Sequence, residues 1–101
     1  MTKQPTHKQL VKAIKKLIIE HGGYCFKHYS GGPVGLNGVA DLIGVFRFRG
    51  KGIAIEVKTG RDRLSSAQAK FLENWRQAGG TALEARDVKT VADALDIPML
   101  I

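Results

Sequence analysis

Hydrophobic residues repeat at helical spacing near the start of this 101-residue chain. The pair Thr6 and Gln9, with the spacing of a capping box, precedes the repeat, and the run His21-Gly22-Gly23 follows it. The pattern therefore predicts a first helix whose buried side carries Leu10, Val11, Ile14, Leu17 and Ile18.

Alternating apolar and polar residues predict strands in the next part of the chain. Residues 24–29 alternate enough to form the first strand. Residues 38–58 contain two apolar runs separated by Arg49-Gly50-Lys51-Gly52, which predicts an antiparallel hairpin. Residues 30–38, rich in glycine, are expected to form a mobile flap at a binding site or a plain connector.

Two more helices are predicted around a last strand, residues 81–86. A second capping box, Ser65 and Gln68, begins a helix that continues to Ala78, and Asp87 caps a short third helix. The buried side of the second helix is expected to carry Ala67, Phe71, Trp75 and Ala78. The resulting order of helix, three strands, helix, strand and helix predicts a single α/β domain, residues 1–101, with a mixed sheet.

The predicted hairpin gathers three ionic side chains on one face. Glu56 and Lys58 are two residues apart and leave the strand on the same side. If the turn is centred between Arg49 and Gly50, Asp41 lies opposite Lys58 and diagonal to Glu56. Centring the turn one residue later leaves these faces unchanged.

Such a cluster is costly to bury in part unless it has a use. A divalent cation relieves the repulsion between two carboxylates, and Mg²⁺ prefers oxygen ligands. A neighbouring lysine can orient or activate the attacking water and stabilise charge on a phosphate. The cluster thus outlines a site for phosphodiester hydrolysis, with a salt-bridged trio on a solvated sheet face as the alternative.

The same residues resemble a known family. Asp41, fourteen intervening residues and then Glu56-x-Lys58 resemble the core of the PD-(D/E)xK nuclease superfamily. The continuation EVKTGRDRLSSAQ, residues 56–68, is similar to the virus-type replication-repair nuclease (VRR-NUC) domain, in which E-V-K-T is followed by a basic loop, L-S and Gln. Ala40 stands where the family usually has proline, a change that we expect the activity to tolerate.

The resemblance implies an αβββαβ core and a DNA endonuclease dependent on Mg²⁺ or Mn²⁺. It implies that Asp41, Glu56 and the Val57 carbonyl hold the metal, and that Lys58 orients or activates the attacking water. Gln68 either supports this group or caps the second helix through Ser65.

Related nucleases often have a further acid near the start of the first helix, whereas this chain reads His7-Lys8-Gln9. Either His7 or Gln9 helps to position the water, or the role is vacant. Gln9 is also expected to be the capping partner of Thr6.

The net charge of +7 favours a polyanionic partner. Cations are expected at the hairpin tip and beside the site, where they would hold a phosphate backbone. Lysines on the first helix either contact phosphate or form a solvated face. With no base-reading motif, recognition by shape is expected through Arg47, Arg49, Lys51, Arg61, Arg63, Lys12 and Lys16.

Stand-alone members of the resembled family are similar to Holliday-junction resolvases, which implies a homodimer acting on branched DNA such as four-way junctions. Two alternatives remain: a non-catalytic nucleic-acid-binding module with the same fold, and a restriction-type enzyme that cuts linear duplex at defined sequences.

The cysteine content and the hydropathy of the chain bear on its expected cellular location. Cys25 is the single cysteine, so neither an internal disulfide nor a cysteine-based zinc site is expected. No apolar run approaches the roughly 20 residues of a membrane span, and no secretory signal precedes the first helix. We expect a cytoplasmic protein of a bacterium or a phage-infected host cell.

Overall fold

The computed structural model describes residues 4–28, 38–46 and 50–99. The observed elements follow the predicted order of helix, three strands, helix, strand and helix. They are α1 (His7–Glu20), β1 (Tyr24–Lys27), β2 (Leu42–Phe46), β3 (Lys51–Val57), α2 (Ser66–Gln77), β4 (Thr81–Ala85) and α3 (Val88–Ala94).

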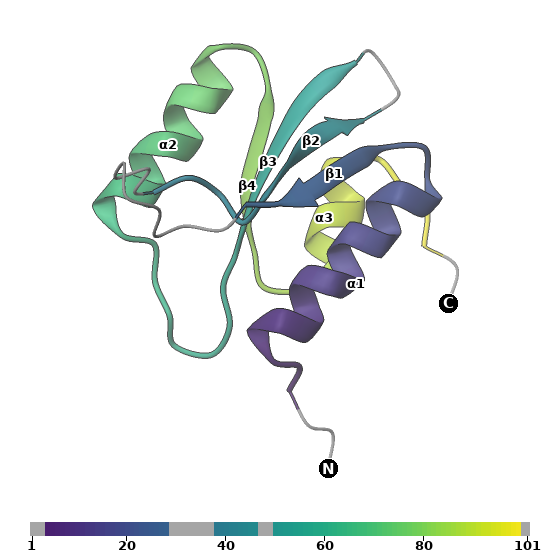
Figure 1. Ribbon diagram of the computed structural model, residues 1–101, viewed down its shortest axis with the longest axis horizontal. Coiled ribbons are helices and arrows are strands. Elements are labelled where there is room, and N and C mark those ends of the chain that lie inside the picture. Colours follow the sequence, from purple (N-terminus) through teal and green to yellow (C-terminus); the bar gives the residue numbers. More distant parts are fainter. Residues whose placement is uncertain (1–3, 29–37, 47–49, 100–101) are drawn as a thin grey trace.

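The strands form one mixed sheet in the order β1-β2-β3-β4. Strands β1, β2 and β3 pair in antiparallel fashion, whereas β4 runs parallel to β3 after the crossover through α2. Helices α1 and α3 cover one face of the sheet and α2 covers the other (Figure 1). The predicted class, a mixed α and β fold around such a sheet, is confirmed.

Helix α1 forms as the sequence predicts. The Thr6 hydroxyl accepts a hydrogen bond from Gln9 N at 3.1 Å, and Gln9 Oε1 accepts one from Thr6 N at 2.9 Å. These reciprocal bonds satisfy main-chain donors that the first turn leaves unpaired. All five apolar residues predicted for its inner side are buried, and they pack in the larger core with Ile53, Ile55 and Val57 of β3.

The buried side of α2 differs from the prediction. Leu72 is the buried residue of this helix, while Phe71 and Trp75 are half-buried and Ala67 and Ala78 are exposed. The sheet surface below α2 consists largely of alanines, so that the long Leu72 side chain can fill the space between helix and sheet. The two aromatic rings flank this contact, and the Trp75 indole donates a hydrogen bond to Gly52 O.

The hairpin register also differs from the predicted one. Leu42 lies opposite Ile55, two residues away from the expected partner Val57. A shift of two residues preserves the face of every side chain, because side chains alternate along a strand. Extending the observed register by one residue places Asp41 beside Glu56 instead of opposite Lys58.

Several predicted features lie outside the described residues. These are Tyr29, the flap apart from Gly38, and the hairpin-tip residues Arg47 and Arg49. Near the end of the described chain, Ile97 is buried and Met99 is exposed. None of the helices in the described ranges is both long and apolar enough to cross a membrane.

Candidate active site

The candidate site lies at one end of the sheet. The carboxyl ends of β1, β3 and β4 meet the start of β2 there, and the amino-terminal ends of α1 and α2 approach from opposite faces (Figure 1). A cleft of about 410 Å³ opens at this end, lined by His28, Gly38, Val39, Asp41, Glu56, Ser65, Ala67 and Gln68.

Asp41 is held by contacts from three directions. Its Oδ2 atom accepts a hydrogen bond from Val57 N at 2.8 Å, and its Oδ1 atom pairs with Lys27 Nζ at 3.1 Å. His7 Nε2 lies 3.2 Å from Oδ2. The carboxylate is therefore fixed in the half-buried gap between β1, β3 and α1.

Glu56 is the buried charged residue among those described. Its Oε2 atom lies 3.4 Å from Lys58 Nζ and accepts a hydrogen bond from Gln68 Nε2 at 3.2 Å. The side chain of Lys58 is only 12% exposed, so its ammonium group is confined beside this carboxylate. The predicted grouping of Glu56 and Lys58 on one face, opposite the buried Ile55 and Val57, is present.

The two carboxylates have opposite pKa shifts. Burial raises the pKa of Asp41, but the hydrogen bond from Val57 N and the nearby Lys27 ammonium outweigh it and hold this pKa below its usual range. Burial and then the charge of Asp41 raise the pKa of Glu56, and the Lys58 ammonium opposes the rise. Neighbouring acids whose surroundings move their pKa values apart are typical of sites in which two carboxylates have different roles.

The start of α1 brings His7, and not Gln9, to the candidate site. His7 Nε2 lies 3.0 Å from Val57 O as well as near Asp41. Gln9 is engaged in the capping box with Thr6. Of the two residues considered for the first-helix position, the structure therefore leaves His7.

Gln68 has both of the roles that the sequence allowed. Its Oε1 atom accepts a hydrogen bond from Ser65 N at 2.9 Å and completes the α2 capping box. Its Nε2 atom donates to Glu56 at the same time. One amide thus fixes the start of a helix and the orientation of a carboxylate.

The donor atoms at this end of the sheet fit a divalent cation. Asp41 and Glu56 offer carboxylate oxygens and Val57 a main-chain carbonyl, which are ligands that Mg²⁺ and Mn²⁺ accept. Across the described ranges, no three His, Cys, Asp or Glu side chains form a ready-made metal cluster. An ion held here would consequently depend on the main-chain oxygen as well as on the side chains.

Gly38 determines how closely the chain approaches α2 before it enters β2. Its φ is +86°, and a Cβ atom placed on it would lie 2.6 Å from Ala67 O. Only glycine fits this position without strain, since it lacks the side chain that would meet the helix. The close contact places Asp41 three residues later beside the first turn of α2.

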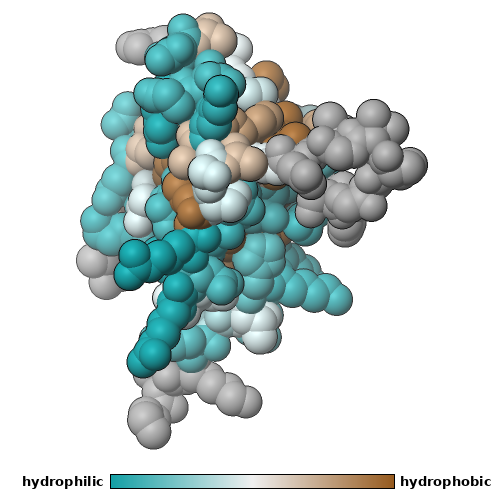
Figure 2. Space-filling view, turned by 90° about the vertical axis from the view of Figure 1, so that its left-hand side faces the viewer, coloured by the Kyte–Doolittle hydropathy of each residue, from teal (hydrophilic) through white to brown (hydrophobic). Residues whose placement is uncertain are grey.

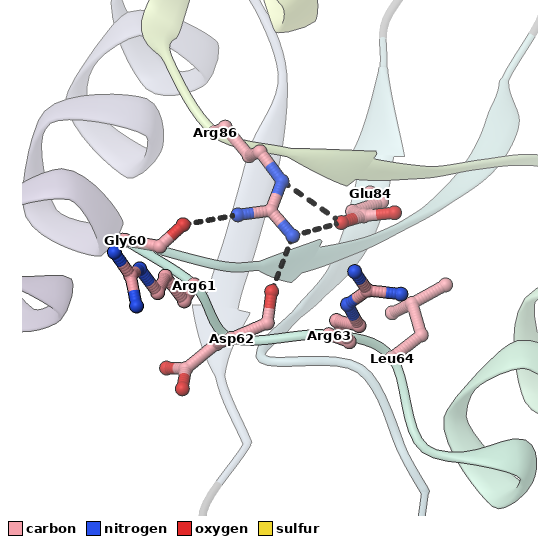
Figure 3. A pocket seen from close by; sticks show the side chains of 7 residues that line it. All are labelled: Gly60, Arg61, Asp62, Arg63, Leu64, Glu84 and Arg86. Carbon is pink, nitrogen blue, oxygen red and sulfur yellow. Dashed lines mark hydrogen bonds and ion pairs between the residues drawn. The ribbon is translucent and has the colours of Figure 1, made fainter.

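The basic loop between β3 and α2 is held in place by Arg86, a residue that the sequence analysis did not single out. Arg86 donates to Gly60 O at 3.1 Å and also to Asp62 O, and it pairs with Glu84 Oε2 at 2.8 Å (Figure 3). The exposed Arg61 and Arg63 lie on the same loop and take no part in these bonds. The recess between loop and β4, about 770 Å³, is larger than the cleft; it lacks the Asp41–Glu56–Lys58 group and is lined by three arginines and two acids.

Sequence reasoning also missed Lys27, the partner of Asp41. One signal was present, because Lys27 is a basic residue in an otherwise apolar or aromatic strand. For Arg86 the signal was weaker, since an arginine just after a strand is common on protein surfaces.

The remaining predicted DNA-binding residues lie in separate places. Lys12 and Lys16 are exposed on α1. Lys51 is exposed at the start of β3, five residues before Glu56 and therefore roughly 16 Å away along the strand at about 3.3 Å per residue. Hydrophilic residues dominate the face of the molecule that carries α2 and the preceding loop (Figure 2).

The mixed sheet, with helices on both faces and two carboxylates and a lysine at one end, is the arrangement that a nuclease-type fold has. The family model of the VRR-NUC domain matches residues 2–88. The chain belongs to the VRR-NUC domain family.

Solved structures support the fold. A structure described as "VRR_NUC domain" aligns over 89% of this chain and 94% of its own with a TM-score of 0.71 and 23% identity. A second, described as "VRR_NUC domain protein", aligns over 93% and 88% with a TM-score of 0.67 and 17% identity. No curated protein matches the chain.

Proposed function

We propose that this protein is a metal-dependent endonuclease that hydrolyses phosphodiester bonds in DNA, with branched DNA such as four-way junctions as its substrate. The observation that carries the proposal is that Asp41 and Glu56 both line a cleft at the end of the sheet, with Lys58 Nζ 3.4 Å from Glu56 and Val57 N bonded to Asp41. Membership of the VRR-NUC family supports it.

Asp41, Glu56 and the Val57 carbonyl are the residues that would hold Mg²⁺ or Mn²⁺. A bound ion of this kind stabilises charge on the scissile phosphate and favours ionisation of water. The chain itself fixes the ligands: Val57 N and Lys27 hold the Asp41 carboxylate, and Gln68 holds Glu56.

Lys58 is the residue that we assign to the attacking water. Its ammonium group is confined next to Glu56 at 3.4 Å, at the point where β3 ends and the basic loop begins. From there it can orient the water towards phosphorus and stabilise the charge that builds on the phosphate oxygens. Because Lys58 N is hydrogen-bonded to Ala85 O of the adjacent strand, the backbone that carries this side chain is fixed.

Contacts with the DNA backbone are assigned to the exposed cations near the site. Arg61 and Arg63 follow Lys58 directly on the loop that Arg86 holds. Lys12 and Lys16 extend the positive charge along α1, and contacts of this type position a duplex without reading its bases.

A homodimer is part of the proposal, because two symmetric cuts in a four-way junction call for two sites. Exposed apolar side chains on the edge strand β1 and on its neighbour β2 support a contact between subunits. Tyr24 and Val45 lie opposite each other across β1 and β2 and are 66% and 49% exposed, and Phe26 on β1 is 49% exposed. We expect sedimentation equilibrium to give the mass of two chains.

The decisive experiment incubates the protein with labelled four-way junction, flap and linear duplex in Mg²⁺, Mn²⁺ or EDTA. Wild type is compared with Glu56→Ala and with Glu73→Ala, which changes an exposed glutamate on α2. We expect metal-dependent cutting of branched DNA by wild type and Glu73→Ala. We expect Glu56→Ala to bind DNA without cutting it.

The Lys27–Asp41 ion pair and the histidine at the first helix favour one rival, a non-catalytic nucleic-acid-binding module. Binding by wild type without cutting under any metal would establish that alternative. Cutting of linear duplex at defined sequences would instead indicate a restriction-type enzyme.

A further inference from the structure

We propose that Arg86 is a positioning residue for DNA binding: its guanidinium group holds the loop of residues 59–64 in the conformation that presents Arg61 and Arg63 to a phosphate backbone. The inference rests on the proposed function, because it concerns how DNA is held next to the cleft of Asp41 and Glu56. It gives Arg86 an effect on DNA affinity without a contact to the DNA itself.

The contacts of Arg86 fix the main chain of this loop at two points. Its Nη1 atom donates to Gly60 O at 3.1 Å, and its Nη2 atom donates to Asp62 O (Figure 3). These carbonyls belong to the peptide bonds that directly precede Arg61 and Arg63. The position from which each of the two loop arginines leaves the chain is therefore set by one side chain of the adjacent strand.

Glu84 keeps the guanidinium group in place. Its Oε2 atom accepts a hydrogen bond from Arg86 Nε at 3.1 Å and lies 2.8 Å from Nη2. Glu84 is the partner of Glu56 in the parallel pairing of β3 and β4, so its negative charge stands one strand away from the candidate site. The contact that holds Arg86 thus also offsets a charge that would repel a polyanion.

Burial does little to hold this loop. Residues 60–63 are all exposed, and the turn itself contributes a main-chain hydrogen bond from Asp62 N to Thr59 O at 3.1 Å. Segments with little buried surface are the ones that open locally at low cost. The end of β3 is held separately, because Lys58 N donates to Ala85 O at 3.0 Å. Loss of Arg86 should consequently loosen the loop and leave the backbone of Lys58 in place.

The geometry of these contacts calls for arginine. A guanidinium group is planar and directs its N–H donors along fixed lines, so it can bind two carbonyls and a carboxylate at once. A lysine at position 86 would keep the positive charge but would lack this arrangement of donors. Arg86→Lys therefore separates the effect of geometry from the effect of charge.

The test compares wild type with Arg86→Ala, Arg86→Lys and, as the matched control, Arg76→Lys. Arg76 is an arginine of α2 whose Nε atom donates to a main-chain carbonyl of β4, Ala82 O, at 2.9 Å, and it does not touch the loop. Affinity for a labelled four-way junction is measured in EDTA over a range of salt concentrations. Hydrogen exchange of the loop amides and single-turnover cleavage complete the comparison, and circular dichroism verifies that each variant is folded.

Both Arg86 variants should exchange the Asp62 amide at least about tenfold faster, since a hydrogen bond to a charged group stabilises by a factor of about ten or more. We expect DNA affinity to fall by about tenfold, because apparent affinity follows the fraction of protein in the binding-competent conformation. The cleavage rate at saturating DNA should stay near that of wild type, while the DNA concentration for half-maximal rate rises. Arg76→Lys should resemble wild type in all these measurements.

The salt dependence distinguishes positioning from direct contact. If Arg86 acts through the loop, the slope of log K against log salt concentration should be the same in Arg86→Ala and wild type. A slope smaller by about 0.9 would show that Arg86 itself contacts a phosphate, and would overturn the proposal.

Unchanged DNA affinity in Arg86→Ala, or full affinity in Arg86→Lys, would also overturn the positioning role and leave the nuclease function intact. If wild type binds the junction but cuts it under no metal, weaker binding by both Arg86 variants would uphold the positioning role and refute the proposed hydrolysis. Absence of DNA binding by wild type would refute both.

Discussion

The amide of Gln68 connects a helix cap to a buried carboxylate. Its oxygen accepts from Ser65 N and its nitrogen donates to Glu56. The two ends of an amide have opposite hydrogen-bonding character, so that one side chain can satisfy both partners. A glutamate here would keep the cap but would place a second negative charge beside Glu56.

Substitutions of Gln68 should therefore separate folding from activity. Ser65→Ala loses the cap alone and should lower the free energy of unfolding by about 1 kcal/mol with cleavage largely retained. Gln68→Glu retains the capping box and should stay within about 1 kcal/mol of wild type, yet lose at least about tenfold in cleavage rate. Chemical denaturation and single-turnover cleavage measure the two effects, and equal cleavage by Gln68→Glu and wild type would refute the orienting role.

Residue identity alone did not decide between His7 and Gln9. Both have side chains able to contact a water or an ion, and they are two positions apart at the start of the same helix. The capping box occupies Gln9, and the rotation of α1 against the sheet directs His7 to Asp41 and Val57. The rotation of α1 is set by packing and has no local sequence signal.

Helices begin in this protein wherever a side chain satisfies the free main-chain donors of the first turn. Thr6, Ser65 and Asp87 each accept a hydrogen bond from the main chain three residues later. Because this signal is local, all three starts were predictable from sequence. The exact inner face of α2 was not, since it depends on the small residues of the sheet below.

The Asp87 cap predicts a pH dependence of stability. Hydrogen bonds from the Thr90 side chain and main chain lower the pKa of Asp87 in the folded state. The cap therefore stabilises fully above the unfolded-state pKa of about 3.9 and is lost as the pH falls through the lower folded-state pKa. Asparagine also caps a helix but does not titrate. Asp87→Asn should therefore not lose this part of its stability as the pH falls.

At neutral pH Asp87→Ala should lower the free energy of unfolding by about 1 kcal/mol, and Asp87→Asn by less. Urea denaturation from roughly pH 2 to pH 7, a range that spans the acid pKa values, compares the three proteins. If Asp87→Asn lost as much stability at low pH as wild type, other carboxylates would be the cause of that loss.

The contact between Gly38 and α2 makes a second prediction at this scale. Gly38→Ala adds a Cβ atom against Ala67 O in a backbone region that side chains rarely adopt. The expected cost is about 1–3 kcal/mol of folding stability, with slower cleavage because Asp41 follows three residues later. Gly50→Ala is the control, since Gly50 also has a positive φ but no atom within 4 Å of the added Cβ. Equal losses of stability in the two variants would argue against the helix contact.

In the whole molecule, the basic loop and the candidate active site lie at the same end of the sheet. The loop that carries Arg61 and Arg63 starts where the strand of Glu56 and Lys58 ends, and Arg86 of the adjacent strand ties the loop down. Because β3 and β4 are parallel, their carboxyl ends lie side by side. The topology therefore brings the cations of the loop to the same end of the sheet as the carboxylates.

Salt dependence of DNA binding tests which cations contact phosphate. Each lost phosphate contact should reduce the slope of log K against log salt concentration by about 0.9. We expect this change for Arg61→Ala and Arg63→Ala, and for Lys12→Ala and Lys16→Ala if α1 contacts DNA. Lys89→Ala, an exposed lysine paired with Asp93 on α3, is the control. Unchanged slopes for the loop arginines would remove them from the interface.

The sequence by itself determined the order of the elements and the faces of α1 and β3. Caps and hydrophobic periodicity act over a few residues, which is why the five buried positions of α1 and the shared face of Glu56 and Lys58 were correctly predicted. The observed register differs from the predicted one by two residues. The prediction of the shared face still held, because side chains alternate along β3 and a shift of two residues keeps each on its face.

Only the tertiary structure decided which distant groups meet. The pairing of Lys27 with Asp41, the approach of His7 to Val57 and the hold of Arg86 on the loop join residues 14 to 50 positions apart. Such contacts depend on how helices rotate and strands stagger when the two cores form. Packing of the entire chain sets those quantities, and no short stretch of sequence encodes them.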